Sequence, residues 1–223
     1  MRKNYDYSIL IRPCGALGQH SLPIYIFLTI LLWITPSFSI SASEEKPLLI
    51  KNQTVEMKDL DGKTVRPFQR IDKKAVALIF TTHDCPIANR YAPEIKRIHQ
   101  DYASKGIQFY LVYVDPDLHD EKVVRQHQSN YQLEGIPTLV DRRHILVTAT
   151  GAEITPEAVV VNPNGLILYR GRIDNLFPAL GKARSRATRH EFRQVLKSVL
   201  EGKKTTIPWV KPVGCYIPTL GID

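Results

Sequence analysis

The sequence predicts an α/β fold, because continuously apolar runs alternate with amphipathic stretches that have helical spacing. Residues 75–80 and 158–161 consist of strand-forming apolar side chains, as expected of strands buried on both faces of a sheet. Residues 86–98 instead carry apolar side chains about one helical turn apart, at Ile87, Tyr91, Ile95 and Ile98. About 180 residues remain when an N-terminal segment is set aside, which is enough for one domain with a single core.

The first half of the domain contains four further predicted elements. Residues 46–66 predict a β-hairpin that turns at Asp61-Gly62, a dipeptide favoured in tight hairpin turns. A second central strand is predicted at 107–114, and a helix with a polar outer face at 118–131. A short strand follows at 137–141, with a helical turn or two after it.

The second half ends with a strand and a helix. Residues 166–170 predict a strand that follows the turn after 158–161. Thr188 and Glu191 have the spacing of a capping box, which predicts the start of an amphipathic helix, and Gly202 is expected to end it.

Cys85 lies where the strand at 75–80 gives way to the first helix, and Pro86 follows at a position where proline is favoured. The partial positive charge at a helix N-terminus favours the thiolate, which is the nucleophilic form of cysteine. The alternative is a small buried side chain without reactivity, as most free cysteines are. His83, two residues earlier, either assists the thiolate as a charged imidazole or is an exposed neighbour without a role.

Two prolines make the pattern more specific. Pro93 lies inside the predicted helix, where proline costs about 3 kcal/mol, and Pro156 precedes the strand at 158–161. With Cys85 at a helix start, these features resemble the thioredoxin superfamily. The resemblance covers roughly residues 47–202 and implies a central mixed sheet flanked by helices, with an N-terminal hairpin and an inserted strand and helix. It also implies that Pro156 is cis and faces Cys85, while Thr155 presents its backbone to an incoming disulfide.

One departure separates the chain from thioredoxin itself. Ala88 stands where a second cysteine would complete a Cys-x-x-Cys motif. Thr82, Cys85 and Pro86 instead match the peroxiredoxin pattern of threonine, peroxidatic cysteine and proline. The chain therefore resembles exported redoxin-domain proteins related to the peroxiredoxins, of the AhpC/TSA type.

Two parts of the peroxiredoxin motif are missing. Leu78 occupies the place of a motif proline seven residues before the cysteine. Arg90 and Arg172 are candidate substitutes for the arginine that lies near the peroxide, but neither matches the motif.

Residues 1–43 predict a signal peptide or an N-terminal membrane anchor. Basic residues come first, an apolar run at 22–34 follows, and small residues precede Glu44. The run is short for a membrane span, which favours cleavage near Ser43, although residues 21–41 could be stretched into an anchor. In both cases the folded domain at 44–202 is predicted to be extracytoplasmic, in the periplasm or secreted.

The export prediction changes how the cysteines are interpreted, because extracytoplasmic compartments permit disulfides. Of the three cysteines, only Cys85 and Cys215 belong to the exported part, and Cys215 lies in a proline-rich tail at 203–223. If the tail folds back, Cys215 can resolve a mixed disulfide or a sulfenic acid formed on Cys85. The alternative is a tail cysteine that is free or paired between chains.

Composition excludes several other functions. The net charge is +8, but an exported chain without a recognition motif is not expected to bind nucleic acid. A solvated basic surface, or attraction to an acidic partner or envelope surface, explains the charge instead. The chain has no zinc-ligand spacing, P-loop or dinucleotide fingerprint, so neither a metal nor a cofactor is expected.

Three functions remain open: thiol–disulfide exchange, peroxide reduction, and a non-catalytic binding module of the cell envelope. The first two require a disulfide or peroxide substrate and an external thiol reductant or redox partner protein. The candidate catalytic residues are Cys85, Thr82 and Cys215, and the candidate substrate-binding residues are Pro86, Thr155 and Pro156.

Overall fold

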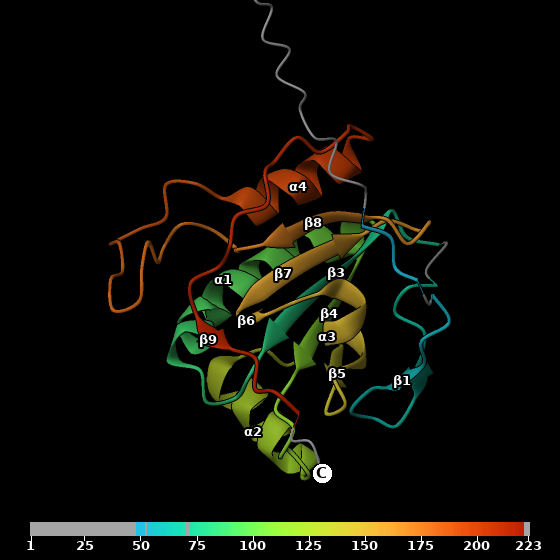
Figure 1. Ribbon diagram of the computed structural model, residues 1–223, viewed down its shortest axis with the longest axis vertical. Coiled ribbons are helices and arrows are strands. Elements are labelled where there is room, and N and C mark those ends of the chain that lie inside the picture. Colours follow the sequence, from blue (N-terminus) through green and yellow to red (C-terminus); the bar gives the residue numbers. More distant parts are fainter. Residues whose placement is uncertain (1–47, 52, 70–71, 221–223) are drawn as a thin grey trace, which may run out of the picture. The chain divides into compact units, whose positions relative to one another are not determined.

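The computed structural model describes residues 48–51, 53–69 and 72–220 (Figure 1). The predicted signal peptide or anchor at 1–43 lies outside these residues, as does the start of the predicted hairpin. Within the described part of the chain, no helix is both long enough and apolar enough to cross a membrane.

Nine strands and four α-helices are assigned in the described residues. The strands are β1 (Met57–Lys58), β2 (Thr64–Val65), β3 (Ala75–Thr81), β4 (Ile107–Tyr113), β5 (Thr138–Val140), β6 (Ile154–Thr155), β7 (Glu157–Val161), β8 (Ile167–Gly171) and β9 (Cys215–Tyr216). The helices are α1 (Pro86–Tyr102), α2 (Glu121–Tyr131), α3 (Ile145–Thr150) and α4 (Glu191–Leu200), and a 3₁₀ turn at Ala103–Lys105 follows α1.

The central sheet has five strands in the order β5-β4-β3-β7-β8. β3, β4 and β5 run parallel, whereas β7 is antiparallel to β3 and β8 is antiparallel to β7. β3 therefore lies at the centre, and its residue Ala77 pairs with Phe109 on one side and Val160 on the other. This arrangement confirms the predicted α/β fold with a central mixed sheet, including the inserted helix α2 and strand β5.

Both faces of the sheet are covered, which explains why its central strands are apolar without alternation. Ala77 and Ile79 of β3 face a core formed with α1, α4 and Val124 of α2. Val76 and Leu78 point to the opposite face, where residues near the N-terminal end of the domain and α3 cover the sheet.

The helix that follows β3 begins as the sequence predicts. Pro86 is its first residue, Pro93 lies inside it, and Cys85 is its N-cap. Tyr91 and Ile95 on its inner face are buried in the core, so α1 is held against the sheet and the position of Cys85 is determined by packing.

The predicted hairpin is present but short. β1 and β2 pair antiparallel, with Met57 opposite Val65, and the turn between them includes Gly62 at φ 76°. A positive φ favours glycine, which is consistent with the Asp-Gly signal in the sequence.

The predicted capping box before α4 is wrong. The N-cap is His190, and no side chain caps that helix end. Thr188 Oγ1 instead accepts a hydrogen bond from Asn175 Nδ2, and Glu191 pairs with Arg172 in a largely buried ion pair. Glu191 therefore neutralises a buried guanidinium, and it is not available to cap the helix.

Candidate active site

Cys85 lies at the end of the central strand and at the start of α1. Its Sγ accepts a hydrogen bond from the backbone N–H of Ala88 at 3.5 Å, as an N-cap side chain does. The side chain is buried, with 1% of its surface exposed. This geometry favours negative charge on the sulfur, because an N–H group and the positive end of the helix dipole both point at it.

The Thr155–Pro156 bond is cis, which confirms that prediction. The backbone carbonyl of Thr155 lies 3.4 Å from Cys85 Sγ, and Thr155 is fully buried. Pro156 follows between β6 and β7, so the predicted proline segment and the cysteine meet at one place.

Cys215 is brought to the same place by the segment that follows α4. This segment folds back so that β9 pairs antiparallel with β6, with Cys215 opposite Thr155 and Tyr216 opposite Ile154 (Figure 1). The Sγ atoms of Cys85 and Cys215 lie 2.6 Å apart, and both cysteines are free. The hypothesis that the tail folds back over Cys85 therefore agrees with the structure.

The two sulfurs are in unequal environments. Burial, the hydrogen bond with Cys85 and the negative charges of Cys85 and Asp84 raise the pKa of Cys215 to about 12. The arrangement therefore keeps Cys215 protonated.

The remaining sequence candidates are placed less closely. Pro86 is exposed at the first position of α1. Thr82 is buried, and among the described residues its Oγ1 has no hydrogen-bond partner, so it does not contact Cys85 in that way. Arg90 is exposed, and Arg172 pairs with Glu191. None of the interactions found in the described part of the chain joins either arginine to Cys85.

His83 is not a simple bystander. Its Nδ1 lies 2.8 Å from Oδ1 of Asp115, the second residue after β4. Burial raises the pKa of Asp115, and the hydrogen bond from His83 opposes that rise. Because β3 and β4 are parallel neighbours, their carboxyl ends meet at one edge, and this rule could have paired His83 with Asp115 from the sequence.

A second buried network supports the loop before Cys85. Asn89 Nδ2 donates to the backbone carbonyl of His83 at 3.1 Å, and its Oδ1 lies 2.7 Å from His127 Nε2. The other ring nitrogen of His127 lies 2.7 Å from the hydroxyl of Tyr113. Asn89 and His127 carry no motif signal, so sequence reasoning missed both of them.

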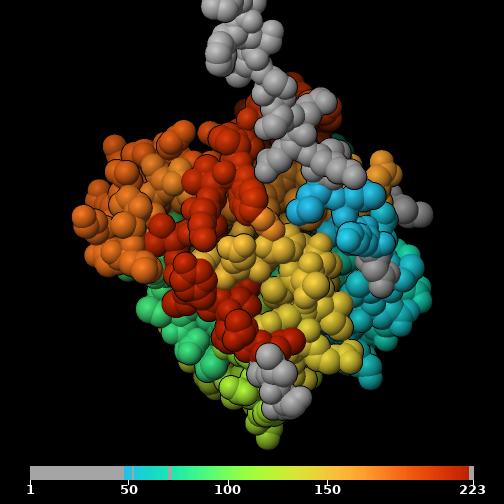
Figure 2. Space-filling view, in the orientation of Figure 1, coloured from blue at the N-terminus to red at the C-terminus, as the bar shows by residue number. Residues whose placement is uncertain are grey.

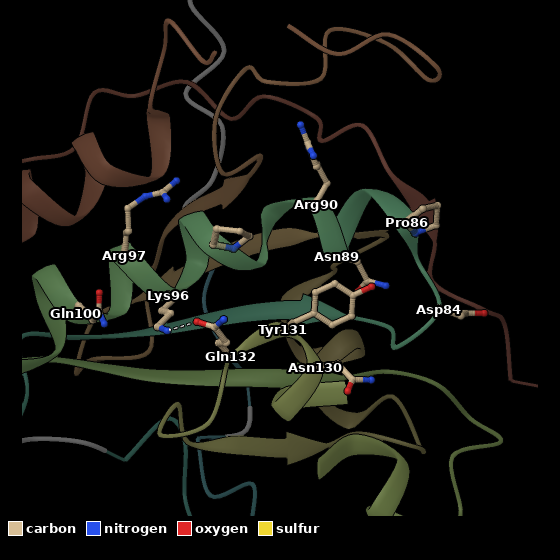
Figure 3. A pocket seen from close by; sticks show the side chains of 11 residues that line it. Asp84, Pro86, Asn89, Arg90, Lys96, Arg97, Gln100, Asn130, Tyr131 and Gln132 are labelled. Carbon is tan, nitrogen blue, oxygen red and sulfur yellow. Dashed lines mark hydrogen bonds between the residues drawn. The ribbon is translucent and has the colours of Figure 1, made fainter. Parts of the chain in front are cut away.

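An open groove of about 900 Å³ begins beside the nucleophile (Figure 3). It follows α1 from Asp84 and Pro86 and extends to Tyr131 and Gln132 at the end of α2. Lys96 Nζ donates to Gln132 Oε1 across it at 2.9 Å. Three basic side chains, Arg90, Lys96 and Arg97, line the groove, and Cys85 is not among its lining residues.

Two groups of side chains have the spacing of a cation site in the described residues. Ligand atoms of His83, Asp84 and Asp115 lie within 4.8 Å of one another, as do those of Glu94, Asp174 and His190. The hydrogen bond between His83 and Asp115 gives the first group a structural role without an ion.

Comparison with known proteins agrees with this geometry. Residues 51–170 match the AhpC/TSA family. The thiol-disulfide oxidoreductase ResA of Halalkalibacterium halodurans is 22% identical over 113 residues, which is 50% of this chain and 61% of that protein. The chain therefore spans less than two thirds of the length of this curated relative.

Two solved structures have a similar fold. A hypothetical protein of Sinorhizobium meliloti is 24% identical with a TM-score of 0.62, covering 74% of this chain and 92% of that one. An uncharacterized conserved protein of Geobacillus kaustophilus is also 24% identical with a TM-score of 0.63, covering 78% and 93%. The family match, the strand order and the cis Thr155–Pro156 bond establish the predicted thioredoxin-like fold.

Proposed function

Because the chain belongs to the AhpC/TSA family, we propose that it performs thiol–disulfide exchange, with Cys85 as nucleophile and Cys215 as resolving thiol. The observation that carries this proposal is the 2.6 Å separation of two sulfurs that are 130 residues apart in the sequence. The second cysteine missing at Ala88 is thereby replaced by one on the returning tail.

The reaction proceeds in two exchanges. The Cys85 thiolate attacks one sulfur of an external disulfide, which forms a mixed disulfide and releases the first external thiolate. Cys215 then gives up its proton and attacks Cys85 Sγ, which forms the Cys85–Cys215 disulfide and releases the second external thiolate. The external disulfide gains two electrons and leaves as two thiolates, which take up the proton released by Cys215 and one proton from solvent. An external dithiol restores the pair by the reverse steps.

Three features support the assignment of roles. The Ala88 N–H and the helix N-terminus stabilise Cys85 as thiolate, both as attacking group and as leaving group. The raised pKa of Cys215 keeps it a thiol until Cys85 has reacted. The Thr155 carbonyl and the cis proline form the wall against which a substrate sulfur would align.

Peroxide reduction is less well supported. A peroxidatic cysteine needs polar groups that polarise the O–O bond, whereas Thr82 Oγ1 makes no hydrogen bond with a described residue and Arg172 is engaged by Glu191. A binding module without turnover is disfavoured because such a module would have no reason to keep two aligned sulfurs.

We also infer that the domain works outside the cytoplasm, where a disulfide between Cys85 and Cys215 persists. The segment at 1–43, with its basic start and apolar run, supports this inference. Mass spectrometry of the N-terminal peptide of the protein purified from its host tests whether the chain is cleaved near Ser43.

Exchange with oxidised glutathione tests the proposed roles. Cys85→Ser is expected to reduce turnover to the background rate, because Cys215 alone can form a mixed disulfide but then has no neighbouring thiol to resolve it. Cys215→Ser is expected to accumulate one glutathione per chain on Cys85, because the mixed disulfide is no longer resolved. Cys14→Ser, which changes the cysteine outside the described domain, is the matched control and should turn over as the wild type does.

Mass spectrometry of the trapped adduct decides between the alternatives. A Cys215→Ser protein that turns over normally would remove Cys215 from the mechanism. A wild-type protein that consumes hydrogen peroxide but does not exchange disulfides would favour the peroxidase, and inactivity in both assays would favour the binding module.

A further inference from the structure

The segment after α4 crosses the molecule as a strap, which we define as residues 203–220 (Figure 2). It runs beside β8, where the N–H of Arg172 donates to the carbonyl of Val210 at 3.0 Å. It then reaches β6, where β9 pairs and the N–H of Ile217 donates to the carbonyl of Glu153 at 2.9 Å. The strap is therefore bound through its backbone at Val210 and again at residues 215–217.

One aromatic contact anchors the middle of the strap. The Trp209 ring lies against the guanidinium of Arg170, 3.6 Å from the ring centroid, although half of the Trp209 side chain is exposed. Lys211 also lies 3.5 Å from the carboxylate of Glu153. The Lys211–Glu153 pair is at the surface and contributes little, whereas the Arg170 side chain under Trp209 is mostly buried. Ile207 and Ile217 of the strap are only partly buried where they pack against the core.

Gly214 lets the strap approach the active site closely. A Cβ atom at this position would overlap the carbonyl oxygen of Thr155 and lie 2.7 Å from its carbonyl carbon. It would also lie 3.0 Å from Cγ2 of Ile154. Only glycine lets the backbone come this near, and the approach places Cys215 against Cys85.

The docked strap uses the edge that an incoming polypeptide would need. β9 satisfies the backbone of β6 at Thr155, which is the residue whose carbonyl lies against Cys85 Sγ. With the strap in place, only 1% of Cys85 is exposed. An external segment carrying a disulfide therefore cannot pair with β6 and reach Cys85 at the same time as β9.

We propose that the strap is autoinhibitory: it occupies the β6 edge as a built-in strand, and Cys85 meets external molecules only after residues 203–220 leave it. The biological role of this inhibition rests on the proposed function, but the experiment below does not require thiol–disulfide exchange. Because β9 is two residues long and half of Trp209 is exposed, the strap can open locally without unfolding of the sheet.

The alkylation rate of Cys85 tests the proposal in the full chain. Cys215→Ser serves as background, because it prevents the disulfide while keeping the strap, and peptide mapping assigns the iodoacetamide label to Cys85. Adding Gly214→Ala, which forces the strap from Thr155, is expected to raise the labelling rate at least tenfold. Chymotrypsin cleavage after Tyr216, which reports release of β9, should accelerate in parallel.

Two further variants keep the test decisive. Trp209→Ala removes the contact with Arg170 without touching the site, and it replaces Gly214→Ala if circular dichroism shows that the latter does not fold. Tyr216→Thr is the matched control, because its side chain is 72% exposed on β9, and it should leave labelling slow.

The proposal is overturned if Cys85 is labelled equally fast with and without Gly214→Ala or Trp209→Ala. It is also overturned if chymotrypsin cleavage after Tyr216 accelerates while labelling of Cys85 does not. Alkylation requires no turnover, so failure of glutathione exchange with slow labelling intact would count against the proposed function alone.

Discussion

At the scale of single residues, Cys85 and Cys215 show that adjacent sulfurs can be chemically unequal. Cys85 has a backbone N–H and a helix N-terminus directed at its sulfur, whereas Cys215 faces the negative charges of Cys85 and Asp84. This inequality is the basis of the proposal that Cys85 attacks and Cys215 resolves.

This inequality predicts how Cys215 ionises. Cys85→Ser removes the neighbouring charge and the hydrogen bond between sulfurs, so the pKa of Cys215 should fall from about 12 toward its ordinary value. Alkylation of Cys215 at about pH 8.5, the ordinary thiol pKa, should therefore be faster in Cys85→Ser than in the reduced wild type. Equal rates of Cys215 labelling in the two proteins would contradict this account.

At the scale of elements, α2 supports the loop that carries Cys85. His127 of α2 lies between the Tyr113 hydroxyl and Asn89, and Asn89 holds the His83 carbonyl. Burial, assisted by the positive charge of His83, lowers the pKa of His127 to about 4. The low pKa keeps the imidazole neutral. Only a neutral ring can donate to Asn89 through Nε2 while it accepts from Tyr113 through Nδ1.

Stability should depend on pH through this histidine. Between about pH 6.5, the ordinary histidine pKa, and about 4, the unfolded chain binds a proton at His127 that the folded state does not. The free energy of unfolding should therefore fall as the pH falls through this window. Below about pH 4, His127 should cause no further change in it.

Urea denaturation of His127→Gln measures this contribution. Glutamine can still donate to Asn89 but does not titrate, so the variant should lose less stability than the wild type between pH 6.5 and 4. Buried carboxyl groups such as Asp115 titrate in both proteins, so the difference isolates His127. His119→Gln, at an exposed site, is the control, and a pH profile identical to the wild type in His127→Gln would refute the prediction.

At the scale of the whole molecule, a Cys85–Cys215 disulfide would close a loop of 130 residues that includes most of the sheet. Loop-closure entropy predicts that oxidation raises the free energy of unfolding by up to about 5 kcal/mol. Urea midpoints of the oxidised and reduced wild type should differ accordingly. Cys215→Ser should not respond to oxidant, and equal midpoints in the wild type would argue against this bridge.

Local patterns in the sequence determined most of the framework. The unbroken apolar run at β3 predicted a strand buried on both faces, and the Cys85-Pro86 pair predicted the start of α1. These predictions succeeded because each depends on residues that are close together in the sequence. Within one element, the spacing of apolar residues directly reflects which side chains are buried. The resemblance to thioredoxin-like proteins added the cis bond at Pro156, which propensities alone do not specify.

Only the tertiary structure decided which distant residues meet. The sequence offered Cys215 as a resolving thiol or as an unpaired cysteine, and the pairing of β9 with β6 brings it to Cys85. The predicted capping box is absent because Glu191 forms an ion pair with Arg172, which lies outside α4. Such contacts join segments far apart in the chain, so they depend on the packing of the whole sheet, whereas local periodicity records only whether each segment is buried.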